Sequence, residues 1–220
     1  MSFTRDEIRE AMLLYAVTDR SWLRPGQTLP QVVERVLDHG ATFLQIREKD
    51  LDPETFEAEA AVLKTLCRAR RVPFVVNDSV EIALACGADG VHVGQSDLQG
   101  RDIRAMIGPD RVLGISAGTV EEARAAERAG ADYIGVGAVF GTSTKQNART
   151  MNPARLREIA GSVSIPVVAI GGIHAGNIRQ LAGCGADGVA VVSAIFGAED
   201  PGAATAELLT LARQMVASRG

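Results

Sequence analysis

The sequence of 220 residues predicts an α/β fold in which eight parallel strands and their helices close into a (β/α)8 barrel, also called a TIM barrel. Two observations predict this class: eight short apolar runs alternate with helical patterns, and an internal repeat marks every second run. An open doubly wound sheet is the alternative, but no G-x-G-x-x-G motif opens a helix after the first run. No linker rich in proline or serine divides the chain, so we expect one domain over residues 1–220.

The repeat consists of Gly-Ala, two variable residues and an apolar run. Its copies are GATFLQI from Gly40, GADGVHVG from Gly87, GADYIGVG from Gly130 and GADGVAVV from Gly185. Each glycine is placed to end a helix, because glycine readily adopts the left-handed conformation found there. The run that follows predicts a strand, and four similar runs lie between the copies. We therefore expect strands at residues 13–19, 43–49, 73–78, 90–94, 112–116, 133–138, 166–171 and 188–193.

Composition excludes several classes of protein. The chain is 46% hydrophobic, which excludes intrinsic disorder, and its net charge of −4 without a basic run argues against nucleic acid as the main partner. No apolar stretch is long enough to span a membrane, and the charged start lacks the apolar core of a secretion signal. Cys67, Cys86 and Cys184 are scattered and odd in number, as expected of core residues in a reducing compartment. We expect a cytoplasmic protein, with outer helices that would permit a homodimer.

The strand expected at 43–49 carries cationic residues. Gln45, Arg47 and Lys49 alternate along it, so they share one face, which we expect to point into the barrel. An arginine and a lysine facing a barrel interior need an anionic partner. The alternative is a structural ion pair with Glu48, which lies on the opposite face. We interpret the set as a binding site for an anionic ligand.

The next two strands end in carboxylates. Asn77 and Asp78 end the strand at 73–78, and Asp97 follows the strand at 90–94. Two carboxylates at neighbouring strand ends suit a magnesium ion (Mg2+), which binds one or two carboxylates together with phosphate oxygens and water. Each aspartate could instead cap the next helix. Beside Arg47 and Lys49, a metal–diphosphate site is the better interpretation.

The remaining strand ends offer hydroxyls, a lysine and glycines. Ser116 ends the fifth strand, and the sixth leads into a loop with the donors Thr142, Ser143, Thr144 and Lys145. A flexible polar loop is the alternative there. Gly171 and Gly172 lie at the end of the seventh strand, while Val192 and Ser193 end the eighth. The loops after strands seven and eight are the usual phosphate site of these barrels.

The histidines give little support for a histidine-based mechanism. His92 lies inside a strand and is interpreted as a satisfied core residue, while His174 could flank the phosphate or face water. No cysteine–histidine or serine–histidine pair is evident for nucleophilic catalysis. Lys64, on the helix after the second strand, is interpreted as an ordinary surface lysine.

Taken together, these segments resemble the thiamine-phosphate synthase family. The matching segments span nearly the whole chain in the family's order: LYAVTDR, LQIREKD, VNDSVEIAL, GADGVHVGQSDL, GISAGTVEEA, GADYIGVGAVFGTSTK, IPVVAIGGI and GADGVAVVSAIF. The resemblance implies a magnesium-dependent (β/α)8-barrel transferase of thiamine biosynthesis. It would join 4-amino-2-methyl-5-hydroxymethylpyrimidine diphosphate to a thiazole phosphate in its carboxylate form, giving thiamine phosphate and diphosphate by way of a carbocation.

The resemblance also implies roles for particular residues. Those matching the pyrimidine-diphosphate site are Gln45, Arg47, Lys49, Asn77, Ser116 and Lys145, of which Arg47, Lys49, Ser116 and Lys145 would be catalytic. Those matching the magnesium ligands are Asp78 and Asp97. Those matching the thiazole-phosphate site are Thr142, Ser143, Thr144, Gly172, Val192 and Ser193.

Some residues depart from the family's pattern, and two rival functions stay open. Many relatives carry proline where this chain has Ala138 and Gly141, and histidine where it has Gly118. One rival is a thiazole tautomerase of the same fold, a branch that typically lacks the arrangement of Asp97 and the T-x-T-K loop. The other is a non-catalytic, phosphate-sensing barrel, which would need no pair of metal ligands.

Overall fold

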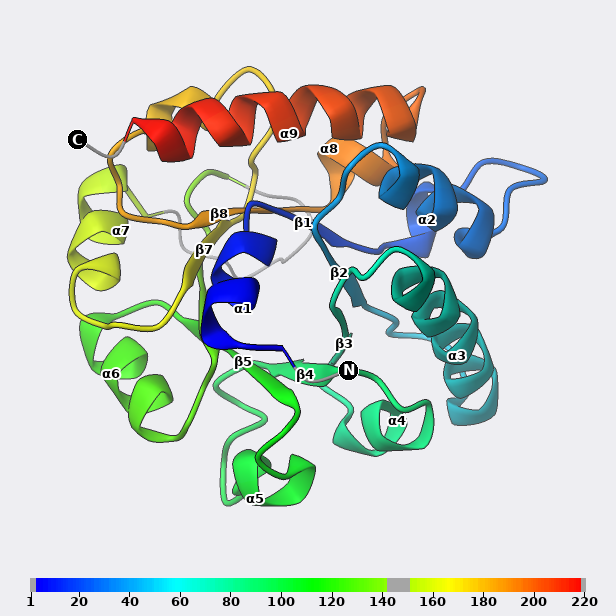
Figure 1. The fold of residues 1–220 in the computed structure, drawn as a ribbon, viewed down its shortest axis with the longest axis horizontal. Helices are drawn as coiled ribbons and strands as arrows, with labels where there is room; N and C mark the ends of the chain where they lie inside the picture. The colour runs from blue at the N-terminus through cyan, green and yellow to red at the C-terminus, as the bar shows by residue number, and fades with distance from the viewer. Residues whose placement is uncertain (1–2, 142–150, 219–220) are drawn as a thin grey trace.

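The computed structural model describes residues 3–141 and 151–218 of the chain. Its strands form a closed barrel in sequence order, with every neighbouring pair parallel and β8 paired to β1 (Figure 1). The strands are β1 (Leu14–Val17), β2 (Phe43–Ile46), β3 (Phe74–Asn77), β4 (Gly90–Val93), β5 (Val112–Ala117), β6 (Tyr133–Gly137), β7 (Val167–Ile170) and β8 (Gly188–Val191). The predicted (β/α)8 barrel is confirmed, and the open sheet is wrong.

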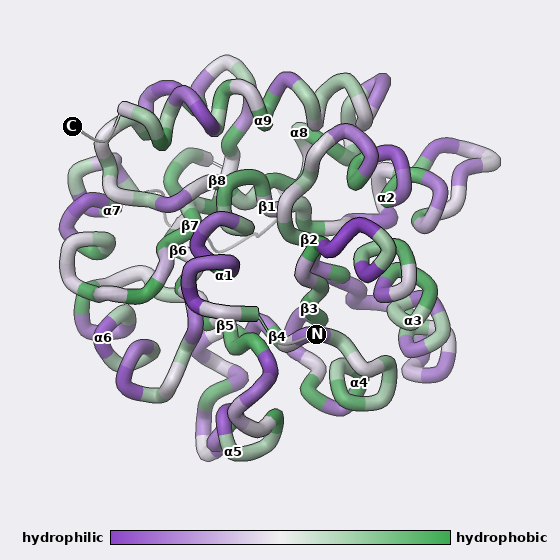
Figure 2. The backbone as a smooth tube through the Cα atoms, in the orientation of Figure 1, coloured by the Kyte–Doolittle hydropathy of each residue, from purple (hydrophilic) through white to green (hydrophobic). Residues whose placement is uncertain are grey.

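Helices follow the strands and surround the barrel (Figure 1). The α-helices are α1 (Arg5–Ala11), α2 (Leu29–Asp38), α3 (Pro53–Ala69), α4 (Val80–Ala85), α5 (Ile103–Ile107), α6 (Val120–Arg128), α7 (Pro153–Ala160), α8 (Ser193–Phe196) and α9 (Pro201–Ala217). Two 3-10 helices are η1 (Arg20–Trp22) and η2 (Ile178–Leu181). Figure 2 shows hydrophobic residues along the strands and many hydrophilic residues on the surrounding helices. None of the helices in the described ranges has the length and apolar character needed to cross a bilayer.

The apolar residues form two cores, one outside and one inside the barrel. The outer core lies between the strands and the helices and holds most of the buried aliphatic side chains. The inner core contains Tyr15, Phe43 and Tyr133, and Ile8 and Met12 from the α1 region pack against it. Because α1 precedes β1, this packing fills the amino-terminal end of the barrel. The carboxyl ends of the strands are left for polar side chains.

The four copies of the repeat connect neighbouring strands by hydrogen bonds. In each copy the side chain of the third residue accepts a hydrogen bond from a backbone N–H near the start of the preceding strand. The pairs are Thr42 with Leu14 at 2.8 Å, Asp89 with Phe74 at 3.0 Å, Asp132 with Leu113 at 2.7 Å and Asp187 with Val167 at 2.7 Å. The glycine two residues earlier has positive φ in every copy, as the sequence predicts. The repeat therefore sets where each even strand begins relative to the odd strand before it.

Each repeat aspartate also holds a cation. Arg104 pairs with Asp132 at 2.7 Å and Arg9 pairs with Asp187 at 2.8 Å. Lys64 of α3 pairs with the buried carboxylate of Asp89. The interpretation of Lys64 as an ordinary surface lysine is therefore wrong: its side chain is 14% exposed and neutralises a buried charge.

Candidate active site

The carboxyl end of β2 presents the predicted cations. Gln45 is buried inside the barrel, as expected, and its Nε2 donates to the Tyr15 hydroxyl at 2.6 Å. The strand ends at Ile46, three residues earlier than the sequence predicts, and the Arg47 backbone N–H donates to the Thr18 side chain at 2.9 Å. Strand alternation stops there, and the loops after β1 and β2 enclose a cavity of about 300 Å³ lined by Asp19, Arg20, Ser21, Trp22, Arg47, Glu48, Lys49 and Asp50.

Glu48, the residue between these cations, forms its ion pair with Arg20 and not with Arg47 or Lys49. Arg20 donates from Nε to Glu48 Oε2 at 2.6 Å and from a terminal nitrogen to Glu59. Burial raises the pKa of Glu48, and the hydrogen bond from Arg20 opposes that rise. Within residues 3–141 and 151–218 neither Arg47 nor Lys49 forms an ion pair, so the structural alternative for these two cations is not supported.

Asp78 and Asp97 lie close together at the ends of β3 and β4. Asn77 Nδ2 donates to Asp78 Oδ2 at 2.5 Å, and Asp97 Oδ2 accepts from the Gly94 N–H at 2.9 Å. Asp78 is exposed as a whole residue, yet protein atoms crowd its carboxyl group. That burial, with the charge of Asp97 and a hydrogen bond to it, raises the pKa of Asp78 to about 6, while Asn77 and Arg47 oppose the rise. The pair is therefore a local concentration of negative charge that a cation would stabilise.

Helix capping does not explain either aspartate. Ser79 is the N-cap of α4, where its side chain accepts from the backbone of the third helical residue, and Asp102 is the N-cap of α5. Asp78 also has a positive φ of 63°, an uncommon backbone conformation for a residue with a side chain. In the part of the chain that the structure describes, no three acidic, histidine or cysteine residues gather around one metal position. The donor set at this point is a pair of carboxylates.

Ser116 lies near the end of β5 and touches a histidine. Its hydroxyl is 3.0 Å from His92 Nε2, and its carbonyl accepts from Gln95 Nε2 at 2.6 Å. The opposite ring nitrogen of His92, Nδ1, is 3.0 Å from the Tyr133 hydroxyl. His92 is 9% exposed and hydrogen-bonded on both sides, so the prediction of a satisfied core histidine is confirmed. Its contact with Ser116 was not predicted from the sequence.

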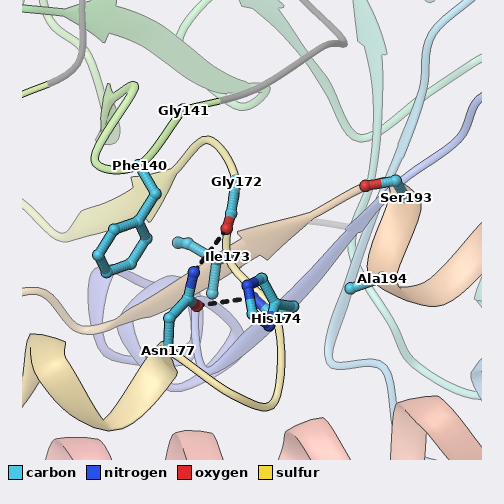
Figure 3. A pocket seen from close by; sticks show the side chains of 8 residues that line it. All are labelled: Phe140, Gly141, Gly172, Ile173, His174, Asn177, Ser193 and Ala194. Atoms are coloured by element: carbon cyan, nitrogen blue, oxygen red, sulfur yellow. Dashed lines mark hydrogen bonds between the residues drawn. The ribbon is translucent and has the colours of Figure 1, made fainter.

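A second cavity opens at the ends of β7 and β8 (Figure 3). Its volume is about 420 Å³, and it is lined by Phe140, Gly141, Gly172, Ile173, His174, Asn177, Ser193 and Ala194. Gly172 has φ 63°, and a Cβ atom there would lie 2.3 Å from the Gly141 carbonyl oxygen, so only glycine fits. Asn177 fixes the loop: its side chain donates to the Gly172 carbonyl at 2.8 Å and accepts from the His174 N–H at 2.9 Å.

The predicted members of this second site are only partly placed. Gly172 and Ser193 line the cavity, whereas Val192 packs against the inner core directly before α8. Thr142, Ser143, Thr144 and Lys145 lie outside the described residues. Asn177 was not predicted as a site residue. Its position in the sequence, five residues after Gly172 in the same loop, is the feature that could have indicated it.

Comparison with known proteins shows the family to which the chain belongs. The model of the family described as thiamine monophosphate synthase matches residues 14–195. The chain belongs to this family. It is 48% identical over 198 residues to a thiamine-phosphate synthase of Ruminiclostridium cellulolyticum, covering 90% of this chain and 94% of the relative. A thiamine-phosphate synthase of Geobacillus thermodenitrificans is 47% identical over 217 residues, covering 96% of each chain.

A solved structure is similar over almost the whole barrel. The thiamine phosphate pyrophosphorylase from Pyrococcus furiosus superimposes with a TM-score of 0.86 at 39% sequence identity, covering 94% of this chain and 98% of that one. The family resemblance seen in the sequence is thereby confirmed.

Proposed function

We propose that this chain is a thiamine-phosphate synthase, a transferase that joins 4-amino-2-methyl-5-hydroxymethylpyrimidine diphosphate to a thiazole phosphate and releases diphosphate. The family match and the high identity to thiamine-phosphate synthases support the activity. The observation that carries the proposal is a pair of separate anion-compatible regions on one end of the barrel. One contains the cavity lined by Arg47 and Lys49, where Arg47 also acts on the charge of Asp78 in the neighbouring Asp78–Asp97 pair, and the other is the glycine-lined cavity at Gly172.

The region at β2, β3 and β4 would hold the pyrimidine diphosphate. Arg47 and Lys49 supply positive charge for the diphosphate, and Gln45 and Asn77 supply amide groups at neighbouring strand ends. Breaking the bond between the methylene carbon and the diphosphate oxygen leaves negative charge on the leaving group, which the two cations would stabilise. The same charges would hold the diphosphate before the bond breaks.

Asp78 and Asp97 would hold the magnesium ion. Their fit rests on the chemistry of the donor set: burial and the neighbouring charge of Asp97 together raise the pKa of Asp78, and a divalent cation would relieve the repulsion between the two carboxylates. When bound beside a diphosphate, magnesium would neutralise charge on the leaving group. Asn77 hydrogen-bonds Asp78 and the Gly94 N–H hydrogen-bonds Asp97, so both carboxylates are held in place before any ion arrives.

The cavity at β7 and β8 would hold the thiazole phosphate. Gly172 allows close approach of the loop backbone, and the Ser193 hydroxyl adds a donor. Fixing the phosphate would place the thiazole nitrogen for attack on the methylene carbon, so that a chance encounter is replaced by a held geometry. The reaction asks for no strong protein base, which fits a histidine already engaged at Tyr133 and Ser116.

The proposal is tested by incubating the purified protein with each substrate alone and with both together in magnesium buffer. We expect thiamine phosphate and diphosphate to form in equal amounts only when both substrates are present. Isomerisation of the thiazole without coupling would instead identify a tautomerase. Binding of one phosphate ligand without product would identify the non-catalytic alternative.

A further inference from the structure

A chain of hydrogen bonds crosses the inside of the barrel and links two of the proposed substrate-binding residues. Gln45 of β2 donates to Tyr15 of β1 at 2.6 Å, and the Tyr15 and Tyr133 hydroxyls are 2.8 Å apart. Tyr133 of β6 meets His92 of β4 at 3.0 Å, and His92 meets Ser116 of β5 at 3.0 Å. These hydrogen bonds thus run from β2 and β1 across the barrel interior to β6, and from there through β4 to Ser116 on β5.

Gly114 makes the middle of this chain possible. In the strand register it lies on β5 between His92 of β4 and Tyr133 of β6. A Cβ atom at Gly114 would lie 2.3 Å from the Tyr133 hydroxyl oxygen and 2.5 Å from His92 Nδ1. Because no side chain stands between them, the phenol and the imidazole can reach each other across one strand.

The chain has a defined direction. Gln45 offers an N–H to Tyr15, so the Tyr15 oxygen accepts and its own O–H is available for Tyr133. If the bonds continue in this direction, Tyr133 donates to His92 Nδ1 and the ring proton lies on Nε2, facing Ser116. Burial raises the pKa of both tyrosines, so both phenols stay protonated. In the reverse direction the Tyr15 oxygen would accept from both Gln45 and Tyr133, its own O–H would have no acceptor among these residues, and a buried donor without an acceptor is costly.

We propose that Tyr133 and His92 are positioning residues that act through Ser116: the chain from Gln45 holds His92 in its Nε2–H form, which makes the Ser116 hydroxyl a hydrogen-bond donor towards the site. His92 fills one lone pair of the Ser116 oxygen, and the Ser116 proton is left to point at a bound ligand. The inference rests on the proposed function for the nature of that ligand, a pyrimidine, whose ring nitrogens accept hydrogen bonds.

The direction of the chain is tested without any activity measurement. Long-range proton–nitrogen NMR spectra of the labelled, ligand-free protein should show His92 as a neutral ring with its proton on Nε2. In Tyr133→Phe the Nδ1 signal should move towards that of a nitrogen without a hydrogen bond. A proton on Nδ1, or on both nitrogens, would overturn the proposal even if the protein couples the two substrates.

A double-mutant cycle tests whether Tyr133 acts through Ser116. Tyr133→Phe should lower kcat/KM for the pyrimidine diphosphate about tenfold, with the KM for the thiazole phosphate unchanged. In a Ser116→Ala background the same change should cost less than about twofold, because the group it positions is gone. An equal loss in both backgrounds would overturn the positioning role.

Phe43→Leu is the control for packing alone. The Phe43 ring lies 4.4 Å from the Tyr15 ring and 5.5 Å from the Tyr133 ring, centroid to centroid, but carries no polar atom. This variant should lower the melting temperature and act additively with Ser116→Ala. Non-additivity as large as that of Tyr133→Phe would show that packing accounts for the coupling and would overturn the proposal. A wild-type protein that fails to couple its substrates would refute the proposed function. The NMR result would then still decide the direction of the hydrogen bonds from Gln45 to Ser116.

Discussion

At the scale of single residues, neighbours decide what a carboxyl group can do. Asp78 and the N-cap residue Asp200 have the same side chain, but the pKa of Asp78 is raised to about 6 while the pKa of Asp200 is lowered. Asp200 accepts hydrogen bonds from helix backbone, whereas Asp78 is crowded by protein atoms and by Asp97. Burial and the neighbouring acid together therefore raise the pKa of Asp78 in the proposed metal site.

The pairing can be measured by titration. In the metal-free protein, Asp97→Asn should lower the pKa of Asp78 below 6, because the neighbouring negative charge is lost while burial stays. Asp200→Asn, on a helix that packs against α2 and η2, is the matched control and should leave that pKa unchanged. Carbon NMR of labelled aspartate carboxyls reports both values. An unchanged pKa in Asp97→Asn would contradict the pairing.

The raised pKa also has a consequence for stability. Between an ordinary aspartate pKa of 3.8 and about 6, the folded metal-free protein binds more protons at Asp78 than the unfolded chain does. Its contribution to stability is therefore largest at low pH and falls as the pH rises through that window. Thermal unfolding of wild type and Asp78→Asn should be measured from pH 4 to 7. The fall in stability with rising pH should be smaller in the variant. An equal dependence of stability on pH in both proteins would contradict this prediction.

Two lysines of this chain should respond oppositely to truncation. Lys145→Ala should lower turnover while sparing the fold, since the resemblance to the family implies a role for Lys145 at the diphosphate. Lys64→Ala should keep its turnover per folded molecule but lose about 1–3 kcal/mol of unfolding free energy, because it leaves the buried Asp89 carboxylate without that cation. Enzyme assays and denaturant unfolding measure both effects. A large loss of stability in Lys145→Ala would make that lysine structural.

Residues whose role follows from their own strand could be predicted from the sequence. Polar side chains at or just after the ends of apolar runs singled out Arg47, Asp78 and Asp97 as candidates, and their places at neighbouring strand ends favoured a metal–diphosphate site. The choice between Asp78 and Ser79 as the helix cap could not be predicted, because the two differ by one position and only the backbone decides. The Tyr15–Tyr133 contact was also missed, since it joins strands that are not neighbours in the barrel.

At the scale of elements, the third residue of each repeat links two neighbouring strands by a side-chain-to-backbone hydrogen bond. Asp187 accepts from the Val167 N–H and pairs with Arg9, and the first repeat uses Thr42 for the same backbone contact. A hydroxyl is therefore sufficient to accept this backbone hydrogen bond, while the carboxylate also forms an ion pair. The repeat predicts the strands correctly from the sequence, but the predicted end of β2 is too late, because strand pairing rather than composition decides where a strand stops.

This backbone hydrogen bond gives a prediction for β7 and β8. Asp187→Ala should cost about 1–3 kcal/mol of unfolding free energy, because the Val167 N–H is left unsatisfied in a buried position. Asp187→Thr, which copies the hydroxyl of the first repeat, should recover part of that loss. Urea unfolding measures both variants. Equal stability of the alanine and threonine variants would show that the backbone hydrogen bond carries little weight.

At the scale of the whole molecule, the barrel separates stability from chemistry. Its amino-terminal end is filled by the inner core and α1, while the polar residues of the proposed site lie at the carboxyl ends of the strands. The two cavities use different parts of that rim, one at β1 and β2 and one at β6, β7 and β8. This layout suits a reaction between two anionic substrates that must be held separately before they meet.

The most direct test is a magnesium titration of the coupling reaction with wild type and Asp78→Asn, following thiamine phosphate and diphosphate together. We expect wild-type product formation to require magnesium and Asp78→Asn to lower turnover by orders of magnitude, since metal stabilisation of a leaving group is worth several kcal/mol. Thermal unfolding near pH 7 should confirm that the variant is folded. Full activity of folded Asp78→Asn, or equal wild-type rates with and without magnesium, would contradict the role of magnesium at Asp78 and Asp97.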